Sequence, residues 1–248
     1  MSTLSVIVIT LNEEKNIGRC LESVKWANEI IVVDSGSTDK TIEIAESYGA
    51  KVYEQGWPGD GPQKYFGIEH ATCEWCLVLD ADEEVTPELA RSIKDVLEHS
   101  NSTCYKMHRR SFFLGKIMKH GDWGRDWIVR LFLRSKHQYT REVAHSKLDV
   151  SKSSAGVLDG KLTHHTQEDI YLSIKKLNDY STLSAKMMLG KGKRSSVFKA
   201  VLRGHLAFIR SYVLRAGFLD GIEGYLCARN IGLGAYLKYI KCVYDFKE

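Results

Sequence analysis

Short apolar segments alternate with amphipathic ones along the first hundred residues of the chain. Four segments predict strands: residues 4–10 and 29–34, which are expected to be buried, a short one at 51–54, and one at 75–79. After the first of them, Ile17, Leu21 and Val24 return at helical spacing, and Asn12 is the expected N-cap of this helix. The chain therefore begins with the order strand, helix, strand.

Three more helices are predicted in the same region. One runs through Ser47 and is capped by Ser37 or Thr38, one lies around residues 63–70, and one runs from Pro87 to about residue 98. Alternation of this kind predicts an α/β fold with a mainly parallel central sheet flanked by helices. Such sheets bind ligands at the carboxyl ends of their strands, near a switch in the strand order.

The periodicity is weaker beyond residue 100. It predicts strands at 104–113 and 127–133, strand and loop over 137–165, a helix from Gln167 to about Leu189, and two or three helices between Val197 and Glu248. We therefore expect an α/β domain over residues 1–165 and a helical C-terminal extension over residues 166–248, packed on the same domain.

The composition is that of a globular protein. The chain has 248 residues, of which 44% are hydrophobic, enough to build a core. Cys73 and Cys76 form a C-x-x-C without a second pair, so reduced thiols are expected rather than a zinc site. The first ten residues do not resemble a signal peptide, and no apolar run reaches the roughly 18 residues of a spanning helix. The sequence thus predicts a cytoplasmic protein.

Charge is unevenly distributed along the chain, although the net charge is only +4. Residues 1–100 carry 8 Lys and Arg against 19 Asp and Glu, residues 101–190 carry 16 against 8, and residues 191–248 carry 11 against 4. An acidic front can hold a metal ion, and a basic rear attracts phosphates or anionic lipid; ordinary surface charge is the alternative. No nucleic-acid-binding motif is present, so nucleic acid is not expected as a partner.

Carboxylates follow two of the predicted strands. Asp80 and Asp82 come directly after the segment WCLVL, and Asp34 ends the segment EIIVVD. Two carboxylates at this spacing can reach one Mg²⁺ or Mn²⁺, which in turn can bridge the phosphates of a nucleoside diphosphate. Solvated turn carboxylates are the alternative for Asp80 and Asp82, and a loop cap is the alternative for Asp34.

Several motifs carry a resemblance to a known family. SVIVITLNEEKNIGRCLESV, IIVVDSGSTDKT, KYFGIEHA and WCLVLDADEEV resemble the family 2 glycosyltransferases of the GT-A fold, over about residues 4–99. WIVRLFLR, THHT, KLNDYS and GFLDGIEGYLCA resemble a subgroup that adds glucose to an inner-core heptose of lipopolysaccharide. The resemblance implies an inverting transfer of glucose from UDP-glucose to that heptose, with Mn²⁺ or Mg²⁺ as cofactor.

The resemblance also implies site residues. The donor residues would be Thr10, Asn12, Glu13, Asp34, Gly36, Lys64 and Asp80. Of these, Asp34 would contact the uracil and Asp80 the ribose or donor sugar, and Gly36 would let the backbone approach the ligand. Asp82, together with Asp80, would hold the metal at the diphosphate.

The general base is left open by the sequence. Inversion by direct displacement needs a carboxylate or a histidine opposite the leaving diphosphate. Relatives in the subgroup often have Val-His-Glu after the RLF strand, whereas this chain has His145 followed by Ser146. Glu142, Asp126 and His145 are therefore unordered candidates, each with a structural alternative.

Three further residues have a functional and a structural interpretation. Arg130 alternates with apolar residues, so it faces either a phosphate or a structural carboxylate. His164 and His165 contribute a metal or phosphate contact, or are structural.

The C-terminal region carries a basic and apolar pattern. Phe198, Leu202, Leu206 and Ile209 form an apolar stripe at helical spacing, beside Lys199, Arg203 and Arg210. This predicts peripheral contact with an anionic membrane surface, and an ordinary helix that covers the sheet domain is the alternative. A lipid A-core or other lipid-linked saccharide would then be the acceptor.

Two other functions stay open at this point. The same enzyme class could use a capsular or polyprenyl-linked acceptor. A protein of another class could bind a nucleotide-sugar or a polyanion without catalysing a reaction.

Overall fold

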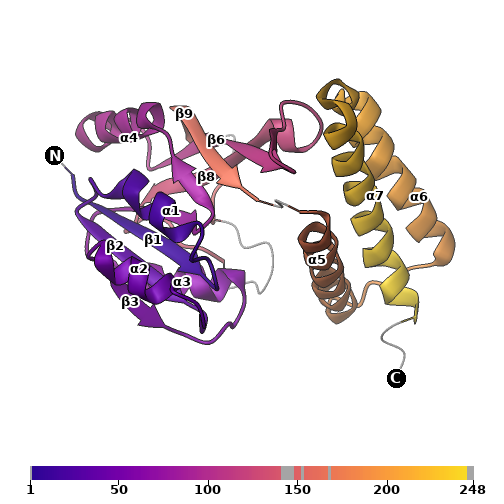
Figure 1. Ribbon diagram of the computed structural model, residues 1–248, viewed down its shortest axis with the longest axis horizontal. Coiled ribbons are helices and arrows are strands. Elements are labelled where there is room, and N and C mark those ends of the chain that lie inside the picture. Colours follow the sequence, from indigo (N-terminus) through magenta and orange to yellow (C-terminus); the bar gives the residue numbers. More distant parts are fainter. Residues whose placement is uncertain (1, 141–147, 152–153, 167–168, 245–248) are drawn as a thin grey trace. The chain divides into compact units, whose positions relative to one another are not determined.

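The computed structural model describes residues 2–140, 148–151, 154–166 and 169–244 (Figure 1). The chain divides into two compact units. Unit 1 holds residues 1–109 and 127–165, and unit 2 holds residues 110–126 and 166–248. Residues 110–126 thus belong to the unit that holds the C-terminal helices. The predicted domain boundary at residue 165 stays a prediction.

A single mixed sheet runs in the order β3-β2-β1-β4-β8-β6-β9-β5. Its strands are β1 Leu4–Thr10, β2 Glu29–Asp34, β3 Lys51–Glu54, β4 Trp75–Asp80, β5 Glu83–Val85, β6 Cys104–Phe113, β8 Asp126–Leu133 and β9 Gly156–His165. The first four are parallel, while the pairs β4–β8 and β5–β9 are antiparallel. The predicted α/β fold is confirmed, with an antiparallel half that the periodicity did not indicate.

Helices cover both faces of this sheet because its central strands are apolar on both sides. One face of β1, β2 and β4 shares a hydrophobic core with three helices: α1 Ile17–Val24, α2 Thr41–Ser47 and α4 Pro87–His99. Helix α3, Asp60–Glu69, packs on the other face through Phe66 and Ile68. Both cores are continuous with fully buried strand residues such as Ile7 and Leu77.

Two of the predicted helix caps are wrong. Asn12 is not an N-cap, because its backbone is left-handed (φ 52°) and α1 begins only after Asn16. Helix α2 begins after Lys40, so neither Ser37 nor Thr38 caps it. The polar groups of these residues bind the neighbouring loop instead, as described below.

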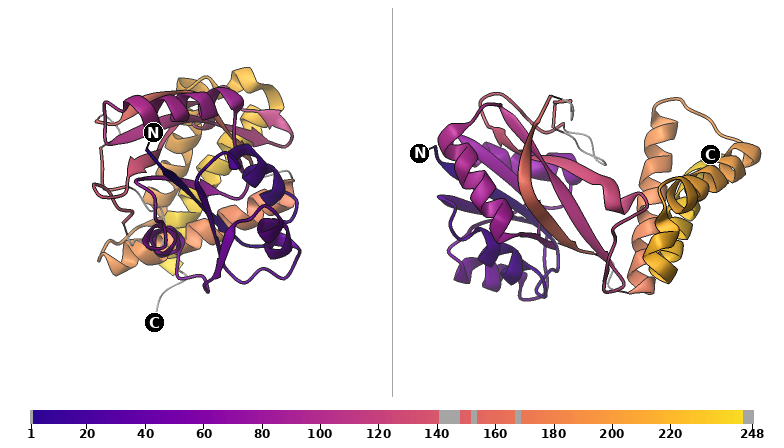
Figure 2. Two further views of the ribbon diagram at one scale, coloured as in Figure 1. Left: turned by 90° about the vertical axis from the view of Figure 1, so that its left-hand side faces the viewer. Right: turned by 90° about the horizontal axis from the view of Figure 1, so that it is seen from above.

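Unit 2 consists mainly of helices. They are α5 Ile170–Gly190, α6 Val197–Ile209 and α7 Gly221–Tyr244, with the short turns η1 Trp123–Arg125, η2 Arg210–Leu214 and η3 Gly217–Asp220. A two-residue strand, β7 Lys116–Ile117, pairs with the end of β6. Helix α7 packs against both α6 and α5, and lies between them in Figure 1, while Figure 2 gives two further views of the same helices. Within the described ranges, no helix is both long and apolar enough to cross a membrane.

A buried lysine ties α7 to α5. Lys241 Nζ donates hydrogen bonds of 2.7–3.0 Å to the hydroxyls of Ser181 and Thr182 and to both the backbone and side-chain oxygens of Asn178. Four oxygen acceptors thus replace the water that this ammonium group loses on burial. The contact explains how the KLNDYS segment fixes the position of the last helix.

The approach of α3 to the sheet depends on Gly67. A Cβ at this position would lie 2.4 Å from Ile7 Cγ2 and 3.0 Å from Val33 Cγ2, so Gly67→Ala overpacks the interface. We expect the free energy of unfolding to fall by about 1–3 kcal/mol, measured by urea denaturation. Gly18→Ala in α1 is the matched control, because its Cβ would meet Ile44 Cγ2 at an ordinary 3.6 Å. An equal loss in both variants would contradict this account.

Candidate functional site

The carboxyl ends of the parallel strands bring the predicted donor residues to one edge. Strand β1 pairs with both β2 and β4, so the order of strands switches at β1. The register places Thr10 opposite Asp34, and Ile9 opposite Asp80. A parallel sheet with such a switch leaves a crevice at this edge, where ligands bind. The structure therefore brings Thr10, Asp34 and Asp80 to the same level.

The loops after β1 and β2 are tied to each other. The Asn12 amide donates to Ser37 Oγ (2.8 Å), and Asn12 Oδ1 accepts from the Thr38 amide (2.8 Å). The next residue, Glu13, forms a similar bond: its amide donates to Thr41 Oγ1 at 2.8 Å. These bonds explain the left-handed backbone of Asn12, an unfavourable conformation that surrounding contacts must hold.

Asp34 organises the second of these loops. It is fully buried, and its Oδ1 accepts hydrogen bonds from the amides of Gly36 (2.8 Å) and Ser37 (2.7 Å). Gly36 has φ 98°, a conformation that favours glycine. These contacts support the interpretation of Asp34 as a cap of this loop. A contact between Asp34 and a nucleobase stays a prediction.

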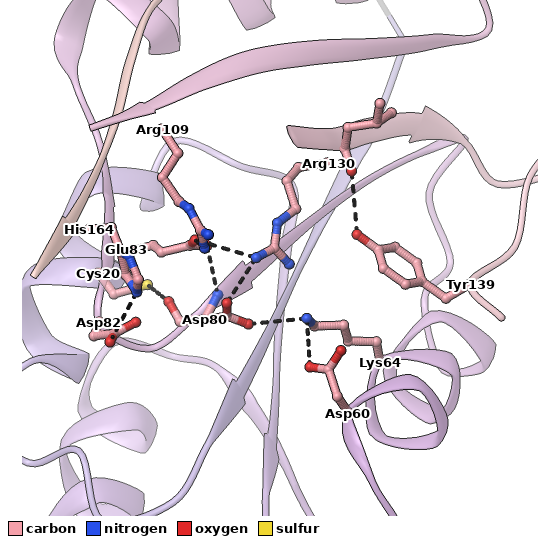
Figure 3. A network of polar contacts seen from close by, with 11 residues as sticks. Cys20, Asp60, Lys64, Asp80, Asp82, Glu83, Arg109, Arg130, Tyr139 and His164 are labelled. Atoms are coloured by element: carbon pink, nitrogen blue, oxygen red, sulfur yellow. Dashed lines mark hydrogen bonds and ion pairs between the residues drawn. The ribbon is translucent and has the colours of Figure 1, made fainter. Parts of the chain in front are cut away.

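Asp80 lies between two cations at the end of β4 (Figure 3). Its Oδ2 is 2.8 Å from Arg130 Nη2, and its Oδ1 is 3.3 Å from Lys64 Nζ, which also contacts Asp60 Oδ1 at 2.7 Å. Burial alone would raise the pKa of Asp80, but the charges of Arg130 and Lys64 outweigh it and hold that pKa well below its ordinary value. The carboxylate is therefore ionised throughout the physiological range.

Glu83 connects this group to the rest of the sheet. Its side chain is completely buried, and Oε1 lies 3.1 Å from Arg109 Nη1 and 3.3 Å from Arg130 Nη2. Its other oxygen, Oε2, accepts the amide hydrogen of Asp80 at 3.0 Å. Burial would lower the pKa of Arg130, but Asp80 and Glu83 raise it well above its ordinary value. The charge on Arg130 is therefore permanent, and it bridges the two carboxylates.

Asp82 points to a different partner, His164. The antiparallel pairing of β5 with β9 sets Glu83 opposite His164, and the His165 amide donates to the Asp82 carbonyl at 2.9 Å. His164 Nε2 then lies 3.4 Å from Asp82 Oδ2 (Figure 3). The adjacent His165 faces away to Glu84 Oε2, at 3.1 Å. The two histidines of THHT therefore have distinct surroundings.

The facing pair Asp82 and His164 fits a divalent cation. A carboxylate oxygen suits Mn²⁺ or Mg²⁺, and an imidazole nitrogen is a common metal ligand in proteins. Within the described ranges no three His, Cys, Asp or Glu side chains gather as a metal cluster, and the described residues offer two facing ligands here. That number suits an ion that completes its shell with substrate phosphates and water, as Mg²⁺ does in phosphate-transferring sites. The role of Asp80 as a second carboxylate ligand stays a prediction.

Unsatisfied polar atoms gather at the same edge. Within the part of the chain that the structure describes, Thr10 Oγ1, Gln63 Oε1 and Arg130 Nη1 are buried without a hydrogen-bond partner. Gln63 is placed by its amide nitrogen, which donates to Ser35 Oγ (3.0 Å) and to the Gln55 carbonyl (3.1 Å). Buried polar groups without partners are costly, and a polar ligand would satisfy them.

The comparisons with known proteins agree with this geometry. The family model described as "Glycosyl transferase family 2" matches residues 5–156. This chain belongs to that family. The GT-A fold and the glycosyltransferase class predicted from the motifs are thereby confirmed.

Proteins that are similar over nearly the whole chain are also named glycosyltransferases. A "Lipopolysaccharide core biosynthesis glycosyltransferase LpsC" of Rhizobium meliloti is 29% identical, over 96% of this chain and 91% of the relative. An "Uncharacterized glycosyltransferase RT0209" of Rickettsia typhi is 28% identical, over 97% and 87%. The chain is therefore a family 2 glycosyltransferase with a relative in lipopolysaccharide core biosynthesis.

Two solved structures are similar to this chain over less than half of their own length. Glucosyl-3-phosphoglycerate synthase from Mycobacterium tuberculosis is 25% identical over 45% of this chain and 44% of that one, with a TM-score of 0.37. S. aureus TarS is 17% identical over 87% and 45%, with a TM-score of 0.49.

Some predicted site residues of this glycosyltransferase stay untested. Glu142 and His145, two of the three candidate bases, lie outside the described residues. The third, Asp126, begins β8 and belongs to unit 2. Lys64 is buried beside Asp80, as a donor-site residue would be, and its role in donor binding stays a prediction.

Three residues of the charged group, Asp60, Glu83 and Arg109, were given no role from the sequence. Glu83 lies inside the DADEE segment without a spacing that sets it apart, and Arg109 is one of two adjacent arginines in β6. Only the tertiary pairing of β6 and β8 beside β4 brings Arg109 and Arg130 to Glu83. For Arg130, the structure shows the carboxylate contact through Nη2, and a phosphate contact stays a prediction.

The pair Asp80 and Arg130 should be strongly coupled in stability. Removing one member takes from the other one of its two counter-ions, so Asp80→Asn and Arg130→Met should each lower the free energy of unfolding by about 2–4 kcal/mol. We expect the double variant to lose at least about 1 kcal/mol less than the sum of the single variants, measured by urea denaturation. The control is the exposed pair Glu22 and Lys25, which should show no measurable coupling. Equal coupling in both cycles would contradict the assignment.

Proposed function

We propose that this glycosyltransferase transfers a hexose from a UDP-hexose, glucose being the first candidate, to a sugar hydroxyl of a lipid-linked saccharide. The transfer inverts the anomeric carbon and depends on Mn²⁺ or Mg²⁺. The observation that carries the proposal is the facing pair Asp82 and His164, beside Asp80 at the switch point of the sheet. It combines a metal-binding donor set with the edge at which such sheets bind nucleotides.

The donor would lie along the carboxyl ends of β1, β2 and β4. Thr10 has a free hydroxyl there, and the tied loops that hold Asn12 and Gly36 present backbone groups at the same edge. Arg130 Nη1 is a buried donor without a partner, suited to an oxygen of the donor sugar or of its phosphates. Asp80 is kept ionised and fixed by its two cations, so it can accept hydrogen bonds from the ribose or from the donor sugar.

Asp82 and His164 would hold the metal ion. When bound, a divalent ion neutralises the diphosphate and makes it a better leaving group. The contribution of the chain is to orient the two ligands, which the pairing of β5 with β9 does. His164 would bind the metal through an unprotonated ring nitrogen.

The acceptor is inferred from the relatives. The name of the Rhizobium meliloti protein refers to the lipopolysaccharide core, and an inner-core heptose is the acceptor that the motifs also favour. Glu142, Asp126 and His145 remain the candidate bases that would take the proton of the acceptor hydroxyl. A lipid-linked acceptor further implies that the protein works in peripheral contact with a membrane surface.

Turnover is the direct test of this function. Purified protein with Mn²⁺, a panel of UDP-sugars and lipid A-core acceptor should release UDP, and product formation should stop when the metal is chelated. Transfer only to a capsular or polyprenyl-linked acceptor would keep the class and change the acceptor. Folded protein that binds UDP-sugar but turns over none, with any acceptor, would identify a binding protein instead.

The two adjacent histidines allow a matched test of the metal site. His164→Ala and Asp82→Asn should each weaken Mn²⁺-dependent UDP binding by about tenfold or more, because each loses a metal ligand. His165→Ala should leave that binding within about twofold, since His165 faces Glu84. Calorimetric titration of UDP with and without Mn²⁺ measures the difference, and circular dichroism checks folding. Unchanged affinity in the Asp82 and His164 variants would remove the pair as the metal site.

A further inference from the structure

A long stretch of unit 2 contains only positive charge. Residues 180–219 include eight Lys and Arg and no Asp or Glu. The stretch covers the end of α5, all of α6, and the turns η2 and η3 up to the residue before Asp220. A surface of this kind attracts anionic surfaces and repels copies of itself.

Helix α6 in this stretch has an inverted arrangement of side chains. Its buried positions are small, namely Ala200, Gly204 and Ala207. Its large apolar residues form an outer stripe that is exposed: Phe198 at 77%, Leu202 at 44%, Leu206 at 50% and Ile209 at 44%. At about 100° per residue these four lie on the side of the helix opposite to the buried ones. A water-exposed helix normally has the reverse pattern.

The small residues have a packing reason. A Cβ added to Gly204 would lie 3.1 Å from the Gly232 carbonyl oxygen, and one added to Gly232 would lie 3.0 Å from the Gly204 carbonyl oxygen. The backbones of α6 and α7 therefore cross closely, as small residues allow in helix pairs. The close crossing of α6 and α7 is made at these small residues, so the outer stripe on the opposite side of α6 is available to another partner.

Exposed apolar residues continue in the chain after α6. Val213, Leu214, Phe218, Leu219 and Ile222 are each between 49% and 73% exposed. Between residues 198 and 222, the described part of unit 2 therefore exposes ten large apolar side chains: the four of the outer stripe, Val201 of α6, four in the turns η2 and η3, and Ile222 at the start of α7. So many exposed large apolar side chains in consecutive elements are typical of an interaction site.

The turns that carry these residues are fixed rather than loose. Asp220 is buried, and its carboxylate accepts hydrogen bonds from the amides of Lys119 (3.0 Å) and His120 (2.8 Å) and contacts His120 Nδ1 at 2.8 Å. Asp122 contacts Arg210 at 2.8 Å and also pairs with Arg215. An apolar surface held in place loses little conformational entropy on binding.

We propose that the outer stripe of α6 and the turns that follow it form a docking surface for an anionic lipid bilayer. The apolar side chains enter the boundary between headgroups and acyl chains, while Lys199 and Arg203, beside the stripe, contact lipid phosphates. Charge selects this partner over a second copy, since two copies would bring two acid-free basic stretches together. The inference rests on the proposed function only in giving docking a purpose, namely access to a lipid-linked acceptor.

Vesicle binding tests the surface with the full-length protein. It should sediment with phosphatidylcholine vesicles that contain phosphatidylglycerol, far less with pure phosphatidylcholine, and less as salt is raised. Leu202→Glu with Leu206→Glu should weaken binding by about tenfold or more, because two charges enter the apolar stripe. Lys199→Gln with Arg203→Gln should weaken it by about fivefold per charge, and only on anionic vesicles.

The control is Val157→Glu, which places the same charge at a 57% exposed apolar position of β9 in unit 1. It should bind vesicles like the parent protein. All variants should keep Mn²⁺-dependent UDP binding without vesicles, so loss of docking and loss of donor binding are separate results. Absence of vesicle binding at low salt would overturn the proposal. So would equal weakening by Val157→Glu, or a concentration-dependent dimer that the paired leucine variant abolishes.

Discussion

The structure of the donor edge depends on buried charges that must compensate one another. Glu83 and Arg130 are buried, and ion pairs and hydrogen bonds offset the cost of removing them from water. The cluster contains three carboxylates and three cations, in Asp60, Asp80, Glu83, Lys64, Arg109 and Arg130. Since these residues come from α3, β4, β5, β6 and β8, the pairing fixes the antiparallel half of the sheet against the parallel half.

This compensation also explains why the two aspartates of the DADEE segment differ. Asp80 forms ion pairs with Arg130 and Lys64. Asp82 lies outside this cluster, and its carboxylate faces His164. Spacing alone treats the two carboxylates as equivalent ligands. Their environments separate them, because one satisfies buried cations and the other faces a second metal-binding side chain.

The parallel strands and their polar ends could be predicted from the sequence, because apolar runs and the residues that follow them are local signals. The partners of Asp80 could not, since Arg130 is 50 residues away and reaches Asp80 only through the pairing of β8 with β4. The two predicted helix caps are wrong for a related reason. Asn12 and Ser37 form a hydrogen bond with each other, although they lie 25 residues apart in the sequence. In α6 the stripe was visible, but its exposure follows from the close helix crossing at Gly204, which periodicity does not reveal.

The charge balance of the cluster bears on the proposed chemistry. Lys64 and Arg130 already compensate Asp80 and Glu83, and the first hundred residues carry an excess of 11 acidic groups. A diphosphate that approached this edge would therefore find little net positive charge from the cluster itself. A divalent cation at Asp82 and His164 would supply it without breaking the buried pairs that hold the sheet together. The requirement for a metal in the proposed function thus has an electrostatic reason in the fold.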